Sequence, residues 1–425
     1  MVAAGRPAAR GAAEPGTAKT AGAAAGGGAL LVAGILALAV NLRAAITGLP
    51  PIFPELSAAG LSPATEAVLA AAPVLCFASL SGVAPGLARR FGEERVLGVA
   101  AVLIAAGLGL RAAAPGVLLF PGTILASSAI AVMNVLLPSL IKRRRPDQVG
   151  LLIGLYLLSL IAGAVLAAAI AVPVFGAVAS SSGTAVAVRV TLGMWAVPAL
   201  AAAFSWLRQC GSGPQSPAQG LGGVGALARR ALAWQVMAYM GLQSLSYYAT
   251  LSWFPTMFRD HGIGAAAAGN LVALMTAGNA VTALVAPLLA QRMADQRLLS
   301  AVAVAAIMAG TAGSVFGSAA TAIWFAAVLG LGQGAAFGLA IFLFTARAAD
   351  GRTAAALSGF AQGGGYLVAA AGPLLIGLLH TATRGWAVPA WVLLAVAAGQ
   401  LAAGLLAGRS RQLSLDEAQG HPAAV

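Results

Sequence analysis

Long apolar runs recur along almost the whole chain. From residue 29 to residue 408, stretches of 18 or more mostly apolar residues follow one another with short polar segments between them. About 20 apolar residues in an α-helix cross the hydrocarbon core of a bilayer. The strands of a membrane β-barrel would instead alternate in polarity over segments of about ten residues. The runs therefore predict an all-α polytopic membrane protein.

The composition agrees with this interpretation and indicates an orientation. Charged residues make up 8% of the chain, whereas a soluble domain carries about 25%. If the N-terminus is cytoplasmic, nineteen of the 24 Lys and Arg residues fall on cytoplasmic tails and loops. Loops that flank membrane helices carry this excess on the cytoplasmic side. The net charge of +13 is thus a topology signal, and we expect both termini in the cytoplasm and no nucleic-acid partner.

The apolar runs divide into twelve expected spans, six in each half of the chain. The boundary between the ninth and tenth spans is the weakest, because only Gly317 and Ser318 separate them. The expected spans are residues 30–50, 64–86, 96–113, 117–141, 149–173 and 187–207, followed by 231–254, 265–290, 297–316, 319–346, 354–379 and 386–408.

A polar linker and an internal repeat define the organisation. Residues 208–230 are rich in Gly, Ser, Pro and Gln, as is typical of a flexible linker. At an offset of 202 residues, the segment that begins at Gly60 matches the one that begins at Gly262, including Pro85 with Pro287 and Arg90 with Arg292. Five regions are therefore expected: a disordered cytoplasmic tail (1–28), an N-terminal six-helix half (29–207), the linker (208–230), a C-terminal six-helix half (231–408) and a cytoplasmic tail (409–425).

Several function classes find no support in the sequence. Cys76 lies inside a span and Cys210 in the linker, so neither a disulfide nor a metal site is expected. No glycine-rich phosphate loop follows a predicted strand, which excludes ATP-driven transport by this chain alone. No set of nucleophile, base and metal ligands lies within the spans, so we expect neither an enzyme nor a cofactor.

Arg43 is the most informative polar residue. It lies thirteen residues into the first apolar run, deeper than any other charged side chain by sequence position. A charge at this depth costs about 2.5–3.5 kcal/mol, and such residues usually serve function. A guanidinium presents a planar fork that suits a small anion. The alternative is a structural arginine that pairs with backbone carbonyls.

Other polar side chains at depth are candidates for contact with a substrate. Thr47 shares a helix face with Arg43, and Gln243 shares one with Tyr247, because both pairs are four residues apart. For Asn41, which matches Gln243 in the repeat, an interhelical hydrogen bond is an equal alternative. The full set of predicted substrate-binding residues is Arg43, Asn41, Thr47, Asn134, Tyr156, Gln243, Tyr247, Gln333, Gln362 and Tyr366.

Acidic residues are missing from the centre of the spans. Eight of the eleven fall on the cytoplasmic side, and Glu55, Glu66 and Asp260 lie near the outer surface. The usual carboxylates of a proton relay are therefore absent. The sequence leaves three modes of transport open: coupling to protons through Glu66, exchange of one solute for another, and uncoupled movement.

Four segments together resemble a known family. The strings NLRAAITGLPPIFPEL, NVLLPSLIKRRRPDQVGLLIGLY, GLQSLSYYATLSWFP and AQGGGYLVAAAGP resemble the cyanate/nitroimidazole (CynX/NimT) transporters of the major facilitator superfamily, over nearly all of residues 30–408. The resemblance implies a carrier of the bacterial inner membrane, and we expect it to be a monomer. It would move small polar or anionic solutes by rocking two halves around a midplane site.

The loop between the second and third spans departs from the superfamily pattern. That pattern resembles G-x-L-A-D-R-x-G-R-R/K, and the chain keeps Arg90, Gly92 and Arg95 as candidate gating residues. Arg89 stands where an acid is usual. An acid at that position would normally pair with cations across the cytoplasmic gate. In this chain that ion pair is therefore either absent or rebuilt around the acids at 93 and 94.

Two alternatives to an anion carrier remain. A drug exporter with a mainly apolar pocket would use Arg43 only structurally. A sensor that keeps the fold without transport would need a soluble appendage, for which the predicted tails offer little sequence.

Overall fold

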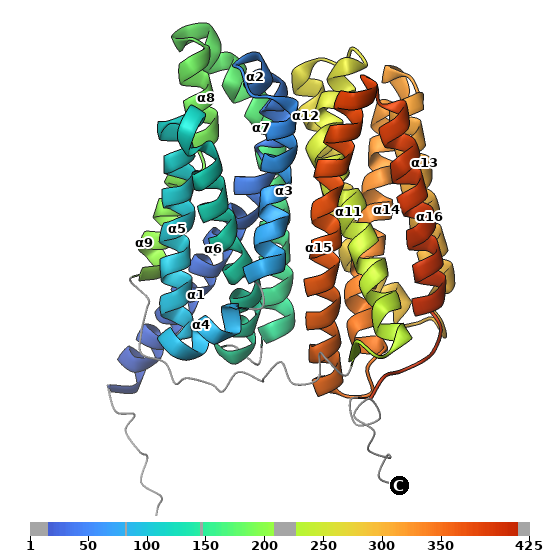
Figure 1. The fold of residues 1–425 in the computed structure, drawn as a ribbon. Coiled ribbons are helices and arrows are strands. Elements are labelled where there is room, and N and C mark those ends of the chain that lie inside the picture. The colour runs from blue at the N-terminus through green and yellow to red at the C-terminus, as the bar shows by residue number, and fades with distance from the viewer. Residues whose placement is uncertain (1–15, 81–82, 145–147, 208–226, 415–425) are drawn as a thin grey trace, which may run out of the picture.

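The helices form two bundles that stand side by side (Figure 1). The structure, a computed structural model, describes residues 16–80, 83–144, 148–207 and 227–414. The N-terminal half consists of α1 (Gly16–Thr47), η1 (Pro50–Ile52), α2 (Phe53–Ala58), α3 (Pro63–Leu80), α4 (Ala84–Phe91), α5 (Glu93–Ala113), α6 (Pro115–Arg144), α7 (Val149–Ser182), α8 (Thr184–Gly193) and α9 (Ala196–Leu207). The C-terminal half consists of α11 (Ala231–Asp260), α12 (Ala265–Ala290), α13 (Arg297–Phe316), η3 (Ala319–Thr321), α14 (Ala322–Ala346), α15 (Gly351–Thr383) and α16 (Ala387–Ala407).

Six membrane-crossing units lie in each half, as the sequence predicts. Eleven stretches of the described chain are long and apolar enough to cross a membrane. The twelfth unit is α11, a 30-residue helix whose Gln, Ser, Thr and Tyr side chains make it less apolar than the others. The all-α fold with two six-helix halves is therefore confirmed.

Some predicted span boundaries are wrong. The second span ends at Leu80, before the short helix α4, and not at residue 86. The fifth extends to Ser182 because its apolar run continues through Phe175 and Val178. The sixth is split into α8 and α9, with Met194 and Trp195 between them. Helix α1 begins at Gly16, inside the segment for which the sequence predicts a tail, where alanines favour a helix.

The two halves touch along two helix pairs, α3 with α15 and α7 with α12. Both pairs approach most closely where a glycine faces the other half. A Cβ atom at Gly377 would lie 2.8 Å from the Cβ of Ala67, and one at Gly269 would lie 3.0 Å from the carbonyl oxygen of Ala168. Small residues at such crossings let helix backbones approach closely within a membrane.

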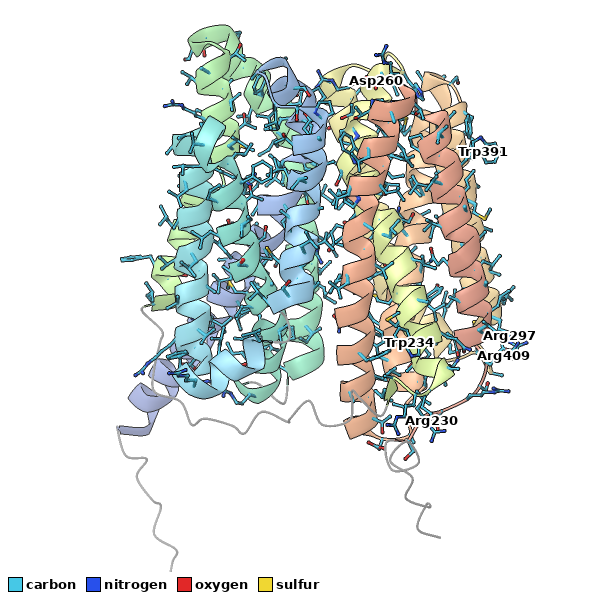
Figure 2. The ribbon with its side chains drawn as sticks, in the orientation of Figure 1. Arg230, Trp234, Asp260, Arg297, Trp391 and Arg409 are labelled. Carbon is cyan, nitrogen blue, oxygen red and sulfur yellow. The ribbon has the colours of Figure 1, made fainter. Side chains whose placement is uncertain are left out.

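The two ends of the bundle differ in charge. We call the end where α1 begins and α16 ends the terminal side, and the opposite end the distal side. Arg230, Arg297 and Arg409 lie at the terminal side, whereas Asp260 lies at the distal side (Figure 2). Trp391, on the outer surface between them, is 64% exposed, as suits a side chain that faces lipid.

The internal repeat reappears as equivalent contacts at the terminal side. In the N-terminal half, Arg144 on α6 pairs with Glu94 at the start of α5. In the C-terminal half, Arg347 donates a hydrogen bond to Gln296, which is 202 residues beyond Glu94. An arginine therefore joins the same two spans in each half, through an ion pair in the N-terminal half and through a hydrogen bond to a neutral amide in the C-terminal half.

The predicted gating residues lie at the junction of α4 and α5. Gly92 has a φ of +87°, which L side chains rarely adopt, and so allows the chain to turn between the two helices. Arg90 and Arg95 are exposed, and the Arg90 guanidinium lies 5.3 Å from the ring centre of Phe91. The neighbouring acid Glu93 pairs with Arg143 at 2.5 Å, so this acidic pair is fastened to α6 of the same half.

Candidate functional site

A cavity of about 450 Å³ lies between the two halves. It extends from the middle of α1 and α11 toward the terminal side, where it approaches the ends of α6, α7, α12 and α14. Ligand sites commonly measure about 300–1,000 Å³ and combine apolar walls with a few polar groups. The polar residues of its lining are Arg43, Tyr156, Gln243, Ser244, Tyr247, Tyr248, Thr276, Asn279 and Tyr366.

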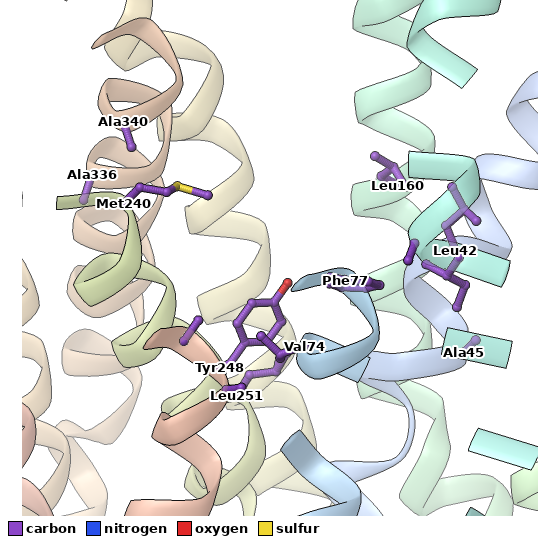
Figure 3. Close-up of a cluster of buried hydrophobic side chains, with 14 of the residues drawn as sticks. Leu42, Ala45, Val74, Phe77, Leu160, Met240, Tyr248, Leu251, Ala336 and Ala340 are labelled. Atoms are coloured by element: carbon purple, nitrogen blue, oxygen red, sulfur yellow. The ribbon is translucent and has the colours of Figure 1, made fainter. Parts of the chain in front are cut away.

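Arg43 is the charged group of the cavity, and tyrosines surround it. Four of the five tyrosines in the chain line the same space, from α7, α11 and α15. The Arg43 Nη1 atom lies 3.4 Å from the hydroxyl oxygen of Tyr248, to which it donates a hydrogen bond. This contact joins α1 of one half to α11 of the other. Figure 3 shows Tyr248 beside Val74 and Leu251 at the boundary between the halves.

The cavity lining contains no Asp or Glu among the described residues. Arg43 therefore makes a hydrogen bond to a neutral phenol and has no carboxylate in the cavity with which to pair. An ionised guanidinium in a site of low dielectric constant gains most from an anion that also accepts its hydrogen bonds. The arrangement favours a ligand that brings its own negative charge.

Polar side chains of the C-terminal half form the opposite wall. Gln243 and Ser244 are consecutive on α11, and Ser244 donates a hydrogen bond to the Gln243 side-chain oxygen at 3.1 Å. The Gln243 Nε2 atom donates to the backbone oxygen of Gln333 at 3.3 Å, which fixes the side chain from behind. Thr276 and Asn279, three residues apart on α12, also line the cavity. Neither residue is among those predicted from the sequence, and the signal that could have identified them is the small number of polar side chains in the eighth span.

The structure brings together half of the residues that the sequence predicts for substrate contact. Five of them line the cavity: Arg43, Tyr156, Gln243, Tyr247 and Tyr366. The other five do not line it: Asn41, Thr47, Asn134, Gln333 and Gln362.

The residues outside the cavity have bonding partners within the helices. The Asn41 side chain donates to the Ala37 carbonyl of its own helix at 2.8 Å. Gln333 is fully buried and donates to the Thr250 hydroxyl at 2.8 Å. Gln362 donates to the Ser358 hydroxyl, one turn earlier on α15. Of these contacts, only the one from Gln333 joins two helices, α14 and α11, whereas Asn41 and Gln362 bond within their own helices.

Arg111 is a second buried cation, which the sequence places only near a span end. Its side chain is buried near the distal end of α5. Nε donates to the Leu192 carbonyl and Nη1 to the Ala45 carbonyl, both at 3.0 Å. Ala45 lies where the α1 ladder breaks, since Leu49 N bonds to the Ile46 oxygen instead. Arg111 thus fastens two interrupted helices, and its exposed fraction of 3% is lower than that of the partly buried Arg43.

The distal side is closed by contacts between the halves. Glu55 on α2 and Arg259 near the end of α11 form an ion pair at 2.7 Å. Nearby, the rings of Phe53 and Trp253 lie 6.1 Å apart. Glu66 accepts a 2.6 Å hydrogen bond from Ser57 and thereby ties α3 to α2. These contacts close the distal side, whereas the lining of the cavity extends toward the terminal side.

We predict that Glu55→Gln weakens the distal closure. The pair is partly buried, so its loss should shift the closed-to-open ratio about fivefold. Spin labels at the exposed positions Ala59 and His261, in a background where both cysteines are alanine, would report a longer distance population. The exchanged pair Glu55→Arg with Arg259→Glu should restore the short distance. An unchanged distribution in Glu55→Gln would contradict the prediction.

Two six-helix bundles with a central cavity between them, closed at the distal side, are the arrangement of membrane transporters that work by alternating access. Residues 29–373 match the Major Facilitator Superfamily, and the chain belongs to that family. The chain is 37% identical over 388 residues to the 2-nitroimidazole transporter of Escherichia coli (strain K12), covering 90% of this chain and 96% of that protein. It is 30% identical over 349 residues to the cyanate transport protein CynX of the same organism, covering 82% and 89%. It is 36% identical over 396 residues to the uncharacterized transporter YycB of Bacillus subtilis (strain 168), covering 92% and 97%.

Solved structures share the fold. A bacterial homologue of the human lysosomal transporter Spinster, in an inward-facing and unoccupied conformation, superposes with a TM-score of 0.72 at 16% identity, covering 90% of this chain and 96% of that one. The D-xylose–proton symporter superposes with a TM-score of 0.70 at 15% identity, covering 90% and 99%. The resemblance that the sequence predicts is therefore confirmed, and the chain is a multi-pass membrane transporter.

Proposed function

We propose that the protein is a secondary transporter of a small anion or polar solute, with a substrate like cyanate or a nitroimidazole. The observation that carries this proposal is the guanidinium of Arg43, which faces a cavity between the halves that contains no carboxylate. A substrate that supplies the missing negative charge gains a charge-assisted hydrogen bond, which is about twice as strong as a neutral one. The names of two relatives, which are 30% and 37% identical, support this substrate class.

In this proposal each half contributes a different part of the site. Arg43 of α1 and Tyr156 of α7 bind the charged end of the substrate from the N-terminal half. Gln243 and Tyr247 of α11, with Tyr366 of α15, orient its polar or aromatic part from the C-terminal half. Tyr248 accepts a hydrogen bond from Arg43 across the boundary, so a bound anion competes with a contact between the halves. Binding of the substrate would thereby weaken the hydrogen bond between Arg43 and Tyr248, which joins the two halves that rock against each other.

The proposed orientation places the terminal side in the cytoplasm. The excess of Lys and Arg on that side follows the positive-inside rule, and the charges at the terminal side in Figure 2 agree with it. The cavity is then open inward and closed outward. We further propose a monomer in the bacterial inner membrane, with both termini cytoplasmic.

A second candidate is an exporter of neutral apolar solutes. It is supported by the apolar part of the cavity wall, which includes Leu157, Leu160, Ile161, Leu284 and Phe337. In that case charge on the solute would not matter, and Arg43 would serve only to bond Tyr248.

A thermal-shift comparison of matched solutes distinguishes the two candidates. Cyanate, 2-nitroimidazole, benzoate and benzamide would each be added to the purified protein, benzamide being the neutral analogue of benzoate. At a hundred times its dissociation constant a ligand stabilises the folded state by about 2.7 kcal/mol, which raises the melting temperature measurably. We expect stabilisation by the anions and none by benzamide. Equal stabilisation by benzoate and benzamide would favour the exporter of neutral solutes.

A further inference from the structure

A second, smaller pocket lies on the distal side of Arg43. Its volume is about 20 Å³, enough for one water-sized group. Its polar lining consists of Arg111, Thr123, Ser127 and Ser252, and its walls come from α1, α3, α5 and α6 of one half and α11 of the other. Like the central cavity, this pocket lies between the halves. Tyr248 lines both spaces and so stands between them.

Arg111 supplies an unneutralised charge to this pocket. Within the described residues it has no carboxylate partner, and its two hydrogen bonds go to backbone carbonyls. A guanidinium carries five N–H donors, so these two bonds leave three donors available. The helix-fastening role of Arg111 accounts for Nε and for one Nη1 hydrogen only.

Thr123 supplies a second group that lacks a partner. Its side chain is 2% exposed, and its hydroxyl makes no hydrogen bond to any described residue. The close crossing of α5 and α6 brings it next to Arg111, because Cβ atoms at Gly107 and Gly122 would each lie 2.5 Å from the carbonyl oxygen of the other glycine. A buried hydroxyl left without a partner loses free energy, whereas one that donates to an anion regains it. Ser127 lies one helical turn deeper on the same face of α6.

We propose that Arg111, Thr123 and Ser127 form an outer anion subsite on the translocation path, distinct from the Arg43 cavity. The anion occupies it when the distal side is open and passes Tyr248 to reach Arg43. With the distal side closed, as here, Leu49 and Leu251 help to reduce the space to about 20 Å³, too small for a polyatomic substrate. This inference rests on the proposed function.

Thr123→Val is the decisive variant, because it removes the hydroxyl, preserves shape and leaves both hydrogen bonds of Arg111 intact. Uptake of labelled cyanate and of labelled 2-nitroimidazole would be measured in proteoliposomes from the distal and the terminal sides separately. We expect the distal-side KM to rise about tenfold, while the terminal-side KM and the equilibrium Kd stay within about twofold. Ser127→Ala should act in the same direction.

Two control variants accompany Thr123→Val. Thr123→Ser keeps the hydroxyl and should retain the wild-type KM. Thr311→Val alters another buried threonine without a hydrogen-bond partner, on α13, and should leave both KM values unchanged. Arg111→Gln also removes two helix fastenings, so its transport is interpreted together with its melting temperature.

The outcomes separate this inference from the proposed function. Wild-type protein that takes up neither labelled anion overturns the proposed function, and the outer subsite with it. Normal wild-type uptake with an unchanged distal-side KM in Thr123→Val overturns the outer subsite alone. A rise in both KM values overturns it as well, since the hydroxyl would then act at the central cavity.

Discussion

Arg43→Gln is expected to lower the affinity of the purified protein for anions about a hundredfold. Glutamine keeps a hydrogen-bond donor toward Tyr248 but removes the positive charge from a cavity that contains no other charged side chain among its described lining residues. The dissociation constant for benzoate, measured by calorimetry, would show the loss. Benzamide, for which we expect no detectable binding to the wild type, should not bind the variant either, because it carries no charge for Arg43 to pair with.

Two further variants define what Arg43 contributes. Arg43→Lys keeps the charge without the planar fork, and we expect an intermediate affinity. Arg189→Gln removes an exposed arginine on α8 and serves as the matched control. If Arg43→Gln and Arg189→Gln both bound benzoate like the wild type, Arg43 would not be the anion ligand.

Gly377→Ala is expected to open the distal side and to impair transport. A Cβ atom at this position would lie 2.3 Å from Trp253 and 2.8 Å from Ala67 of the other half. The Trp253 ring has little room to move, because it is buried and its N–H donates to the Pro373 carbonyl at 2.8 Å. Overpacking of this kind costs about 1–3 kcal/mol, which corresponds to a shift of about tenfold in the ratio of closed to open protein. The spin-label pair at Ala59 and His261 would measure this shift.

Controls separate this opening from a general loss of stability. Gly363→Ala lies on the same helix, where a Cβ atom would meet nothing within 4 Å, and should leave the distances unchanged. Ala67→Gly removes the partner in the other half, so the double variant should recover part of the closed population. A closed population in Gly377→Ala equal to that of the wild type would show that this crossing does not limit closure.

The fold could be predicted from the sequence because the bilayer imposes a strong and local rule. Each crossing needs about 20 apolar residues in a helix, and that pattern can be counted along the chain. The span of α11 is counted in the same way, over residues 231–254. Helix breaks could not be predicted by this rule: at the split between α8 and α9, Arg111 reaches across from α5 to bond the Leu192 carbonyl, a contact that no local pattern reveals.

The candidate site could be predicted only in part, because it depends on how each helix is rotated about its axis. Gln243 and Gln333 look alike in sequence, yet the side chain of one lines the cavity and that of the other bonds Thr250 behind it. Tyr248 directly follows Tyr247 in the sequence and is not among the predicted residues, yet it lines the cavity and bonds Arg43. Trp253 lies close to the end of the expected seventh span, but it is buried between helices. Arg111 was overlooked because its distance from the span end does not reveal that neighbouring helices cover it.

The size of the central cavity has a consequence for hydration. A three-atom anion fills only a small part of about 450 Å³, and the polar side chains that gather around Arg43 can hold water beside a smaller solute. Such an anion would enter the cavity with much of its hydration shell and exchange only the waters that face Arg43. Selection would then depend on charge and on the few polar contacts near the guanidinium. Solutes of quite different size could use the same cavity, the larger ones by displacing more water.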